Sequence, residues 1–404
     1  MLRITGATLV LPDTLIADGA VDVGADGRIA FCGRQADAPP VDPRGQVIDA
    51  TGQYLAPGFV DMHVHGAAGH DFMDGTPAAF EAVLAAHARH GTTTIVPTNT
   101  VGRHDQILAF LECCRALVRA GPDASRGLPR VAGAHLYGPY FAEEKVGCHP
   151  RLTRPPTRDE YLQYLAYAPD ALMVATCAPE LDGAADFYRD AAARGVRLNA
   201  GHSNATWDEM AAAHALGVRH VDHLFCAMSN YVSVRTRFAP PYRGGMLEFV
   251  LATPDMTTEI IADGRHLAPE LLRFAVTMKG ADKVALVTDA SRAMDMPPGA
   301  YRFGPTDGGE SFYHDGEVGL TLDGRSLASG ARGMDHMVRH MHRVAGLDLP
   351  TAARMASLTP ATILRIEREV GSIEVGKLAD FVLLDQADLR VRSVYVGGAA
   401  IPMA

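Results

Sequence analysis

The sequence lacks the features that would tie it to a membrane or to nucleic acid. No window reaches about 18 consecutive apolar residues, the length that a membrane-spanning helix needs. Lys and Arg number 37 against 47 Asp and Glu, giving a net charge of -10. This charge argues against nucleic acid or an anionic membrane as a general partner, although a local basic pocket for a phosphorylated small molecule remains compatible with it.

Disulfide and targeting patterns are also missing. The six cysteines are scattered along the chain without a Cys-x-x-Cys motif, which favours a reducing compartment. The first residues, Met1 to Gly6, show neither the charged leader nor the long apolar run of a secretion signal. We therefore expect a cytoplasmic protein that acts on a small molecule.

The two ends of the chain share a β pattern. With 404 residues, 48% of them hydrophobic, the chain is long enough for one large domain and a smaller one attached to it. Short strand-like runs broken by Asp-Gly turns occupy residues 1–53, and a second all-β stretch occupies residues 372–404. Because chain ends commonly lie near one another, we predict a small β-sandwich domain built from both termini.

Residues 54–371 alternate strand-like and helical patterns. The strand-like runs number eight and lie near residues 59–64, 92–97, 130–136, 172–177, 197–201, 220–225, 257–262 and 283–288. Eight strands with intervening helices indicate an α/β fold, a (β/α)8 barrel of the TIM type. The active site of such a barrel lies at the carboxyl ends of its strands.

The expected strand ends carry a recurring set of metal-binding side chains. His63 and His65 are two residues apart in a strand and therefore share a face. His202, His223 and Asp289 lie at the ends of the fifth, sixth and eighth strand-like runs. Imidazole nitrogens bind zinc at about 2.0–2.1 Å. Surface histidines would not fall at strand ends so regularly, so the set predicts a metal site. An alternative role for Asp289 is a helix N-cap.

These segments resemble a known family. The sequence is similar to the amidohydrolase superfamily, and within it to the N-acetylglucosamine-6-phosphate deacetylases, in residues 57–74, 201–206, 223–228, 260–266, 287–290, 355–361 and 371–380. The resemblance covers nearly the whole chain. It implies a metal-dependent hydrolase that removes the N-acetyl group of an amino sugar, and it implies a homodimer.

The resemblance also assigns roles to single residues. It makes His202 and His223 metal ligands, lets His63 and His65 hold metal at a neighbouring position, and makes Asp289 the catalytic carboxylate. A bound zinc ion would lower the pKa of a water to about 7. Asp289 would take the proton of the attacking water and pass it to the departing nitrogen. His149 matches a family histidine that contacts the substrate near the scissile amide, so we expect it to be catalytic; the alternative is a loop histidine beside a proline. His266, Ala227 and Cys226, which stands where the family has asparagine, are expected substrate contacts.

Two departures from the family pattern change what we expect. Where the family has a metal-binding glutamate after the third strand, this chain has Tyr137, whose free phenol titrates near about 10 and stays neutral. Two dications without a bridging anion repel strongly, so we expect one divalent metal, most simply zinc, and a substrate contact for Tyr137.

The second departure concerns the substrate. The segment 230–243 differs from the family's phosphate-binding loop, although Arg235, Arg237 and Arg243 offer anion contacts or a solvated basic loop. Arg292 replaces a small residue and suggests a reshaped pocket. Two alternatives stay open: an amidohydrolase of the same fold that cleaves another C–N or lactone bond in a non-phosphorylated substrate, and an inactive sugar-binding relative.

Overall fold

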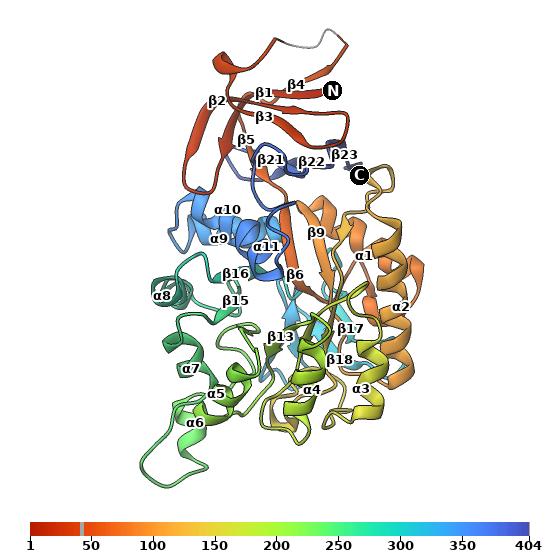
Figure 1. Ribbon diagram of the computed structural model, residues 1–404, viewed down its shortest axis with the longest axis vertical. Helices are drawn as coiled ribbons and strands as arrows, with labels where there is room; N and C mark the ends of the chain where they lie inside the picture. The colour runs from red at the N-terminus through yellow and green to blue at the C-terminus, as the bar shows by residue number, and fades with distance from the viewer. Residues whose placement is uncertain (41–43, 404) are drawn as a thin grey trace.

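Both chain termini contribute to one β sheet. The computed structural model describes residues 1–40 and 44–403. The eight strands of this sheet lie together at one end of the molecule (Figure 1): β1 (Leu2–Val10), β2 (Leu15–Val23), β3 (Ile29–Arg34), β4 (Gln46–Asp49), β5 (Gln53–Pro57), β21 (Phe381–Asp385), β22 (Val391–Val396) and β23 (Ala399–Ala400). The expectation of a small β unit made from both ends is confirmed.

The sheet divides at β1. The first half of β1 pairs in parallel with β4, and its second half pairs in parallel with β5, which continues into β21, β22 and β23. A small core then draws apolar side chains from β1–β3 on one side of this division and from β5, β21 and β22 on the other, including Ile4, Leu55 and Phe381. Both parts therefore bury their apolar side chains in a shared interior.

The central region is a curled parallel sheet. Its strands are β6 (Phe59–Val64), β9 (Thr92–Pro97), β10 (Arg130–Val131) with β11 (Ala134–Tyr137), β12 (Leu172–Thr176), β13 (Arg197–Ala200), β14 (His220–Val221), β15 (Thr257–Ile261) and β16 (Val284–Val287). The backbone N–H of Asp289 donates to the carbonyl of His63 at 3.0 Å and joins the last strand to the first. The predicted barrel is confirmed.

Helices follow most of these strands and cover the outside of the barrel (Figure 1). They are α1 (Pro77–Arg89), α2 (His104–Ala120), α3 (Arg158–Leu165), α4 (Ala184–Ala192), α5 (Trp207–Ala215), α6 (Tyr231–Arg235), α7 (Met246–Ala252), α8 (Pro269–Lys279), α9 (Met334–Arg343), α10 (Leu349–Ala356) and α11 (Leu358–Leu364). Local signals fix their starts. The Thr76 hydroxyl caps α1, and Thr206 and Glu209 form a capping box at α5.

Four short antiparallel strands after β16 were not predicted. They are β17 (Gly299–Phe303), β18 (Glu310–His314), β19 (Val318–Thr321) and β20 (Leu327–Gly330), and a two-stranded ribbon, β7 (Gly66–Ala67) with β8 (His70–Asp71), follows the first barrel strand. Phe303, Leu327 and Ser329 from these strands reach the cavity described below. Among the described residues, no helix has the length and apolarity to cross a membrane.

Candidate metal-binding active site

A cavity of about 370 Å³ lies at the carboxyl ends of the barrel strands. This volume falls in the range of roughly 300–1,000 Å³ typical of small-molecule sites. Most of the residues expected to contact metal or substrate line it: Tyr137, His149, His202, His223, Cys226, Ala227, His266 and Asp289. His63 and His65 are buried next to Asp289, so the structure brings together all five predicted metal ligands.

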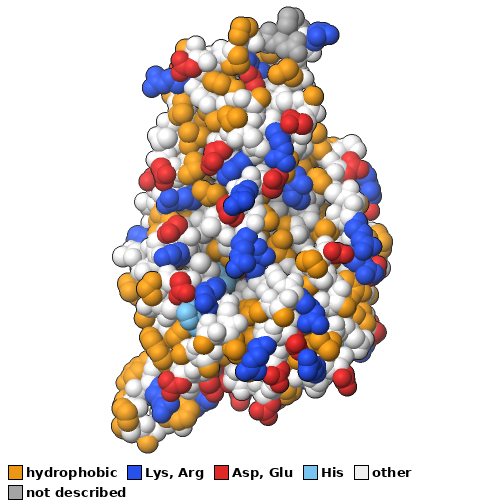
Figure 2. All heavy atoms as spheres, in the orientation of Figure 1, with side chains coloured by type: hydrophobic (Ala, Val, Ile, Leu, Met, Phe, Trp, Pro, Cys, Tyr) orange, Lys and Arg blue, Asp and Glu red, His pale blue; other side chains and the backbone are white. Residues whose placement is uncertain are grey.

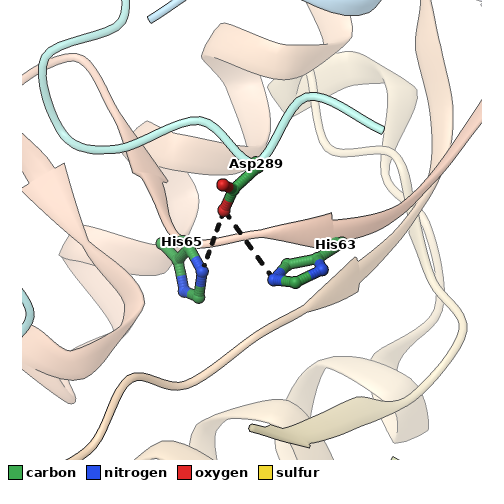
Figure 3. A group of neighbouring side chains, drawn as sticks. All are labelled: His63, His65 and Asp289. Carbon is green, nitrogen blue, oxygen red and sulfur yellow. Dashed lines mark ion pairs between the residues drawn. The ribbon is translucent and has the colours of Figure 1, made fainter. Parts of the chain in front are cut away.

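His63, His65 and Asp289 converge on one point (Figure 3). The Oδ1 atom of Asp289 lies 3.2 Å from Nε2 of His65 and 3.7 Å from Nε2 of His63. The three ligand atoms all lie within 4.8 Å of one another. Two atoms bound at about 2.0–2.1 Å to a tetrahedral ion lie roughly 3.3–3.4 Å apart, so this spacing suits a metal ion.

The tautomers of the two histidines also suit a cation. Nδ1 of His65 donates to the backbone carbonyl of Thr98 at 3.1 Å, and Nδ1 of His63 is hydrogen-bonded to the Glu259 carboxylate. Each Nε2 atom therefore presents a lone pair toward Asp289. Nε2 of His63 is buried without a hydrogen-bond partner among the described residues. Two lone pairs and a carboxylate facing each other need a positive charge between them.

The charges around this point favour the same conclusion. Burial lowers the pKa of His63, but the Glu259 carboxylate outweighs burial and raises that pKa to about 9. Burial raises the pKa of Asp289, but the neighbouring His65 and His63 hold it below its ordinary range. The carboxylates around this point therefore favour a positive charge, carried by the proton of His63 in the metal-free protein or by a metal ion that displaces this proton, and Asp289 is ionised.

His202 and His223 form a second, adjoining pair. Nδ1 of His202 donates to the carbonyl of Lys145 at 2.5 Å, so its Nε2 lone pair faces Nε2 of His223 at 3.2 Å. The Tyr137 hydroxyl lies 2.6 Å from that same atom of His223. Burial, followed by the charges of Asp222 and Asp289, raises the pKa of Tyr137 well above its ordinary value.

Tyr137 is consequently a neutral partner at this second position. Its hydroxyl is hydrogen-bonded to Nε2 of His223, the atom that a metal would need, and the phenol brings no negative charge. No carboxylate replaces the missing charge there, because the groups that can hold an ion among the described residues are His63–His65–Asp289 and His63–Asp222–Glu259. The two histidine pairs are thus unequal: one has an anionic ligand and the other has a neutral phenol.

The backbone is strained where these side chains are presented. His202, His223 and Asp289 have φ values of +47°, +24° and +43°, and Ala227 has +47°. Residues with a Cβ rarely adopt this left-handed region, and such strain clusters at functional sites. Each strand therefore ends abruptly and turns its last polar side chain into the cavity.

His149 is neutral and has a defined donor. Its Nδ1 accepts a hydrogen bond from the backbone N–H of Val101 at 3.2 Å, so the proton lies on Nε2. Burial, followed by the neighbouring His202, lowers its pKa well below the ordinary value. Because His149 lines the cavity, its Nε2–H can donate to an oxygen of a bound molecule.

His266, which lines the cavity, forms a fixed pair with Asp263. Nδ1 of His266 lies 2.7 Å from Oδ2 of Asp263, whose other oxygen accepts from the backbone N–H groups of Arg265 and His266. Burial lowers the pKa of His266, but the Asp263 hydrogen bond outweighs burial and raises that pKa. This pair orients the His266 ring toward the cavity, as expected for a substrate contact.

A buried network below the cavity was missed by sequence reasoning. The two oxygens of Glu259 contact Nδ1 of His63 and Nε2 of His220, the latter at 3.2 Å. Asp222 accepts from Thr176 and Asn199, both at 2.8 Å. Carboxylates that hold the second nitrogen of a ligating histidine fix its tautomer and orientation. The available signal was a glutamate within the apolar run Thr257–Ile261.

Lys145 was also missed. Its side chain lines the cavity and donates to the carbonyl of Met228 at 3.1 Å, and burial lowers its pKa. Among the described residues that line this cavity, Lys145 is the only lysine or arginine.

The arginines of the 230–243 segment lie elsewhere. Arg235 lies against the Tyr231 ring, Arg237 donates to the backbone carbonyl of Asn204, and Arg243 forms an exposed ion pair. Arg235 and Arg237 do not line the cavity of this chain. Their predicted role in substrate binding therefore has no support within one subunit.

Arg292, which was predicted to contact the substrate, is bound by other groups of the protein. Its guanidinium pairs with Asp74 at 3.0 Å and donates to the carbonyls of Gly304, Arg302 and Gly69 at 2.6, 2.6 and 3.1 Å. The side chain is buried away from the cavity lining. It holds the loops after β8, β16 and β17 together, so its hydrogen-bonding capacity is not available to a substrate.

The fold and this site define a metal-dependent hydrolase built on a barrel. Residues 54–401 match the model of the Amidohydrolase family. The chain is 32% identical over 354 residues to an N-acetylgalactosamine-6-phosphate deacetylase of Escherichia coli O157:H7, covering 87% of this chain and 89% of that protein. It is 31% identical over 391 residues to an N-acetylglucosamine-6-phosphate deacetylase of Vibrio furnissii, covering 95% and 91%.

A solved structure agrees with these relatives. A mutant N-acetyl-D-glucosamine-6-phosphate deacetylase from Mycobacterium smegmatis, in complex with N-acetyl-D-glucosamine-6-phosphate, matches with a TM-score of 0.87 and 28% identity over 99% of both chains. The chain belongs to the amidohydrolase family and, within it, to the N-acetylhexosamine-6-phosphate deacetylases. The resemblance stated from the sequence is confirmed.

Proposed function

We propose that this protein hydrolyses the acetamide of an N-acetylhexosamine 6-phosphate, releasing acetate and the free amino sugar phosphate. The observation that carries this proposal is the convergence of His63, His65 and Asp289 beside a cavity of about 370 Å³. The two relatives named above are called deacetylases of such substrates, and the chain spans most of their length.

We further propose that His63, His65 and Asp289 hold one divalent ion. Zinc is the simplest choice, because it binds imidazole nitrogens and carboxylate oxygens well. Such an ion makes a coordinated water acidic and polarises an acyl oxygen. His202 and His223 are the weaker position, because Tyr137 supplies no charge there and hydrogen-bonds Nε2 of His223. They remain available to hydrogen-bond the substrate.

The remaining steps belong to the protein's own side chains. The ionised Asp289 accepts a proton from the attacking water and returns it to the amide nitrogen as the C–N bond breaks, which leaves a neutral amine. His149 donates from Nε2–H to the acyl oxygen, where negative charge develops. The Glu259 carboxylate fixes the His63 ring throughout.

Lys145 is proposed to meet the phosphate. The side chain lies on the cavity wall, and an ammonium group is a good partner for a phosphate oxygen. Apart from Lys145, no lysine or arginine among the described residues lines the cavity. This shortage of positive charge favours a second candidate function, hydrolysis of a substrate without a phosphate. A non-phosphorylated N-acetylated substrate would need no such partner.

Turnover and metal content test the proposal together. We expect purified protein to contain about one zinc per chain and to release acetate from N-acetylglucosamine 6-phosphate or N-acetylgalactosamine 6-phosphate. Asp289→Asn is expected to lower kcat by about 10²–10⁴-fold, the contribution of a positioned acid-base group. Equal kcat/KM for N-acetylglucosamine without its phosphate would favour the second candidate. No acetate release from any of the three would overturn the deacetylase proposal.

We also propose a homodimer. The projecting segment that contains α6 exposes a group of large apolar side chains, Tyr231, Val232, Phe238 and Tyr242. Exposed apolar clusters of this kind are typical of interaction surfaces. Light scattering that gives the mass of one chain, 43.1 kDa, across micromolar concentrations would contradict the dimer.

A further inference from the structure

A second cavity, of about 340 Å³, lies at the other end of the barrel. Its walls come from the first residues of β13, β14 and β15 and from the end of α11. Three arginines line it, Arg197, Arg219 and Arg365, together with His220. Figure 2 shows Lys and Arg side chains gathered around a hollow in the middle of the visible face, over the region of α11 and β13.

Two of the arginines are not neutralised by a carboxylate. Arg219 forms an ion pair with Asp255 at 3.2 Å, so its charge already has a carboxylate partner. Arg197 donates only to the backbone carbonyl of Ile363, at 3.2 Å. Arg365 has no hydrogen-bond or ion-pair partner for its guanidinium within residues 1–40 and 44–403. Both guanidinium groups are therefore left with free donors at the cavity.

The backbone position of Arg365 is unusual for an arginine. Arg365 is the C-cap of α11 and has φ +60° and ψ +37°, the left-handed conformation. Glycine, or sometimes asparagine, is the usual residue at such helix ends, because other side chains are strained there. An arginine at a helix end often bonds to the last carbonyls, but this guanidinium does not. Helix termination therefore does not explain this residue.

The two guanidinium groups repel one another. Burial, followed by the charge of Arg365, lowers the pKa of Arg197 to about 10, and the opposing charge of Glu367 does not offset these effects. Glu367 also has a buried oxygen without a partner among the described residues, and it forms no ion pair with either arginine. Like charges held together without a counter-ion favour the binding of an anion.

We propose that this cavity is a binding site for a small phosphate-bearing metabolite, whose phosphate is held between Arg197 and Arg365. Guanidinium groups match phosphate oxygens in pairs, with two N–H donors each. The cavity is larger than a phosphate ion, and Met62, Val174 and Leu198 give it an apolar wall for a carbon skeleton. A ligand here lies at the strand starts, away from the metal-binding side chains at the strand ends, so the site is not catalytic.

Calorimetric titration of the full-length, metal-loaded protein tests this site. The probes are inorganic phosphate and glucose 6-phosphate, which carries no acetamide. We expect wild type to bind at least one of them, and tighter binding of glucose 6-phosphate would identify a sugar phosphate as the ligand class. Arg365→Gly and Arg197→Gln should each weaken this binding by about 10- to 100-fold, the effect of losing charge-assisted hydrogen bonds.

The variants keep the test independent of folding and of the active site. Arg365→Gly relieves the left-handed strain, so its unfolding temperature should stay the same or rise while anion binding is lost. Binding at the metal site would be unchanged in Arg365→Gly. The exposed Arg119→Gln on α2 serves as the matched charge control. Equal affinities in wild type, Arg365→Gly and Arg197→Gln, or no binding of either probe to wild type, would overturn the proposal.

Discussion

Nδ1 of His63 is hydrogen-bonded to the carboxylate of Glu259, and neither side chain has any exposed surface. The bond leaves the Nε2 lone pair of His63 facing Asp289. A buried carboxylate that binds the far nitrogen of a ligating histidine sets its tautomer and strengthens it as a ligand. Glu259 is therefore a positioning residue, although it lies below the cavity.

Glu259→Gln should weaken metal binding without removing the ligands. The amide keeps the shape of the side chain but loses the charge that orients His63, so we expect zinc affinity to fall by about 10- to 100-fold. Chelator competition on the purified variant measures this change. The exposed Glu317→Gln is the matched control, and an unchanged zinc affinity in Glu259→Gln would show that His63 is oriented by other contacts.

Tyr137→Glu should raise the metal content from about one to two ions per chain. The new carboxylate would supply the missing charge beside His202 and His223, and loss of the phenol would free Nε2 of His223. Metal analysis after dialysis against zinc gives the stoichiometry. Tyr137→Phe, which frees the nitrogen but adds no charge, should stay near one ion. Two ions in wild type would refute the single-metal interpretation.

His149→Ala should lower kcat far more than it raises KM. Its Nε2–H is directed by the bond from Val101 to Nδ1, and a donor to a developing negative charge contributes about 10²–10³-fold in rate. Steady-state kinetics on N-acetylglucosamine 6-phosphate measure both constants. An increase in KM with an unchanged kcat would instead make His149 a residue for ground-state binding.

Protein stability should depend on pH through His90. Burial lowers the pKa of His90, but its hydrogen bonds to Asp295 and Asp335, both at 2.9 Å, outweigh burial and raise that pKa to about 10. The folded pKa lies above the unfolded value of about 6.5. This stabilisation is therefore complete below about pH 6.5 and is lost as the pH rises through about 10.

Urea unfolding of wild type and His90→Gln at pH 6.5 and at pH 10 isolates this effect. The variant should be less stable by about 1.5–3 kcal/mol at the lower pH, the usual contribution of hydrogen bonds to a charged group. The difference should shrink at the higher pH, because at pH 10 the unfolded chain has lost the proton of His90 and the folded protein holds it about half of the time. A difference that is the same at both pH values would contradict the charged state of His90.

The strands and the main ligands could be predicted because their signals are local. Apolar runs such as Thr257–Ile261 and Val284–Val287 identify strands directly, and a polar residue at the end of each run falls at the active-site face. His63 and His65 needed only their spacing of two. The eight strands, the β unit from both ends and the convergence of the five predicted ligands all follow from such short-range patterns.

The rest depends on distant neighbours. Glu259 has its role only because His63, 196 residues away, meets it inside the barrel. Arg292 closely follows Asp289 in sequence, yet its side chain turns to Asp74, because chain proximity does not fix side-chain direction. Among the described residues, the strands β17–β20 form a sheet of their own that is joined to the barrel segment by a bridge between Gly330 and Ala290. Burial alternates along β17 and β18, but these runs are only five residues long and lie between Gly-rich turns, so the sequence signal is short.

The backbone bond from Asp289 N–H to the His63 carbonyl has a consequence for how activity arises during synthesis. During synthesis, the four imidazoles of the site have all been added once residue 223 is reached. The fifth group, the carboxylate of Asp289, is added together with the backbone N–H that joins the last barrel strand to the first. Because the proposed proton carrier and the closing bond belong to one residue, we expect a chain that ends before Asp289 to be inactive and its barrel to be open.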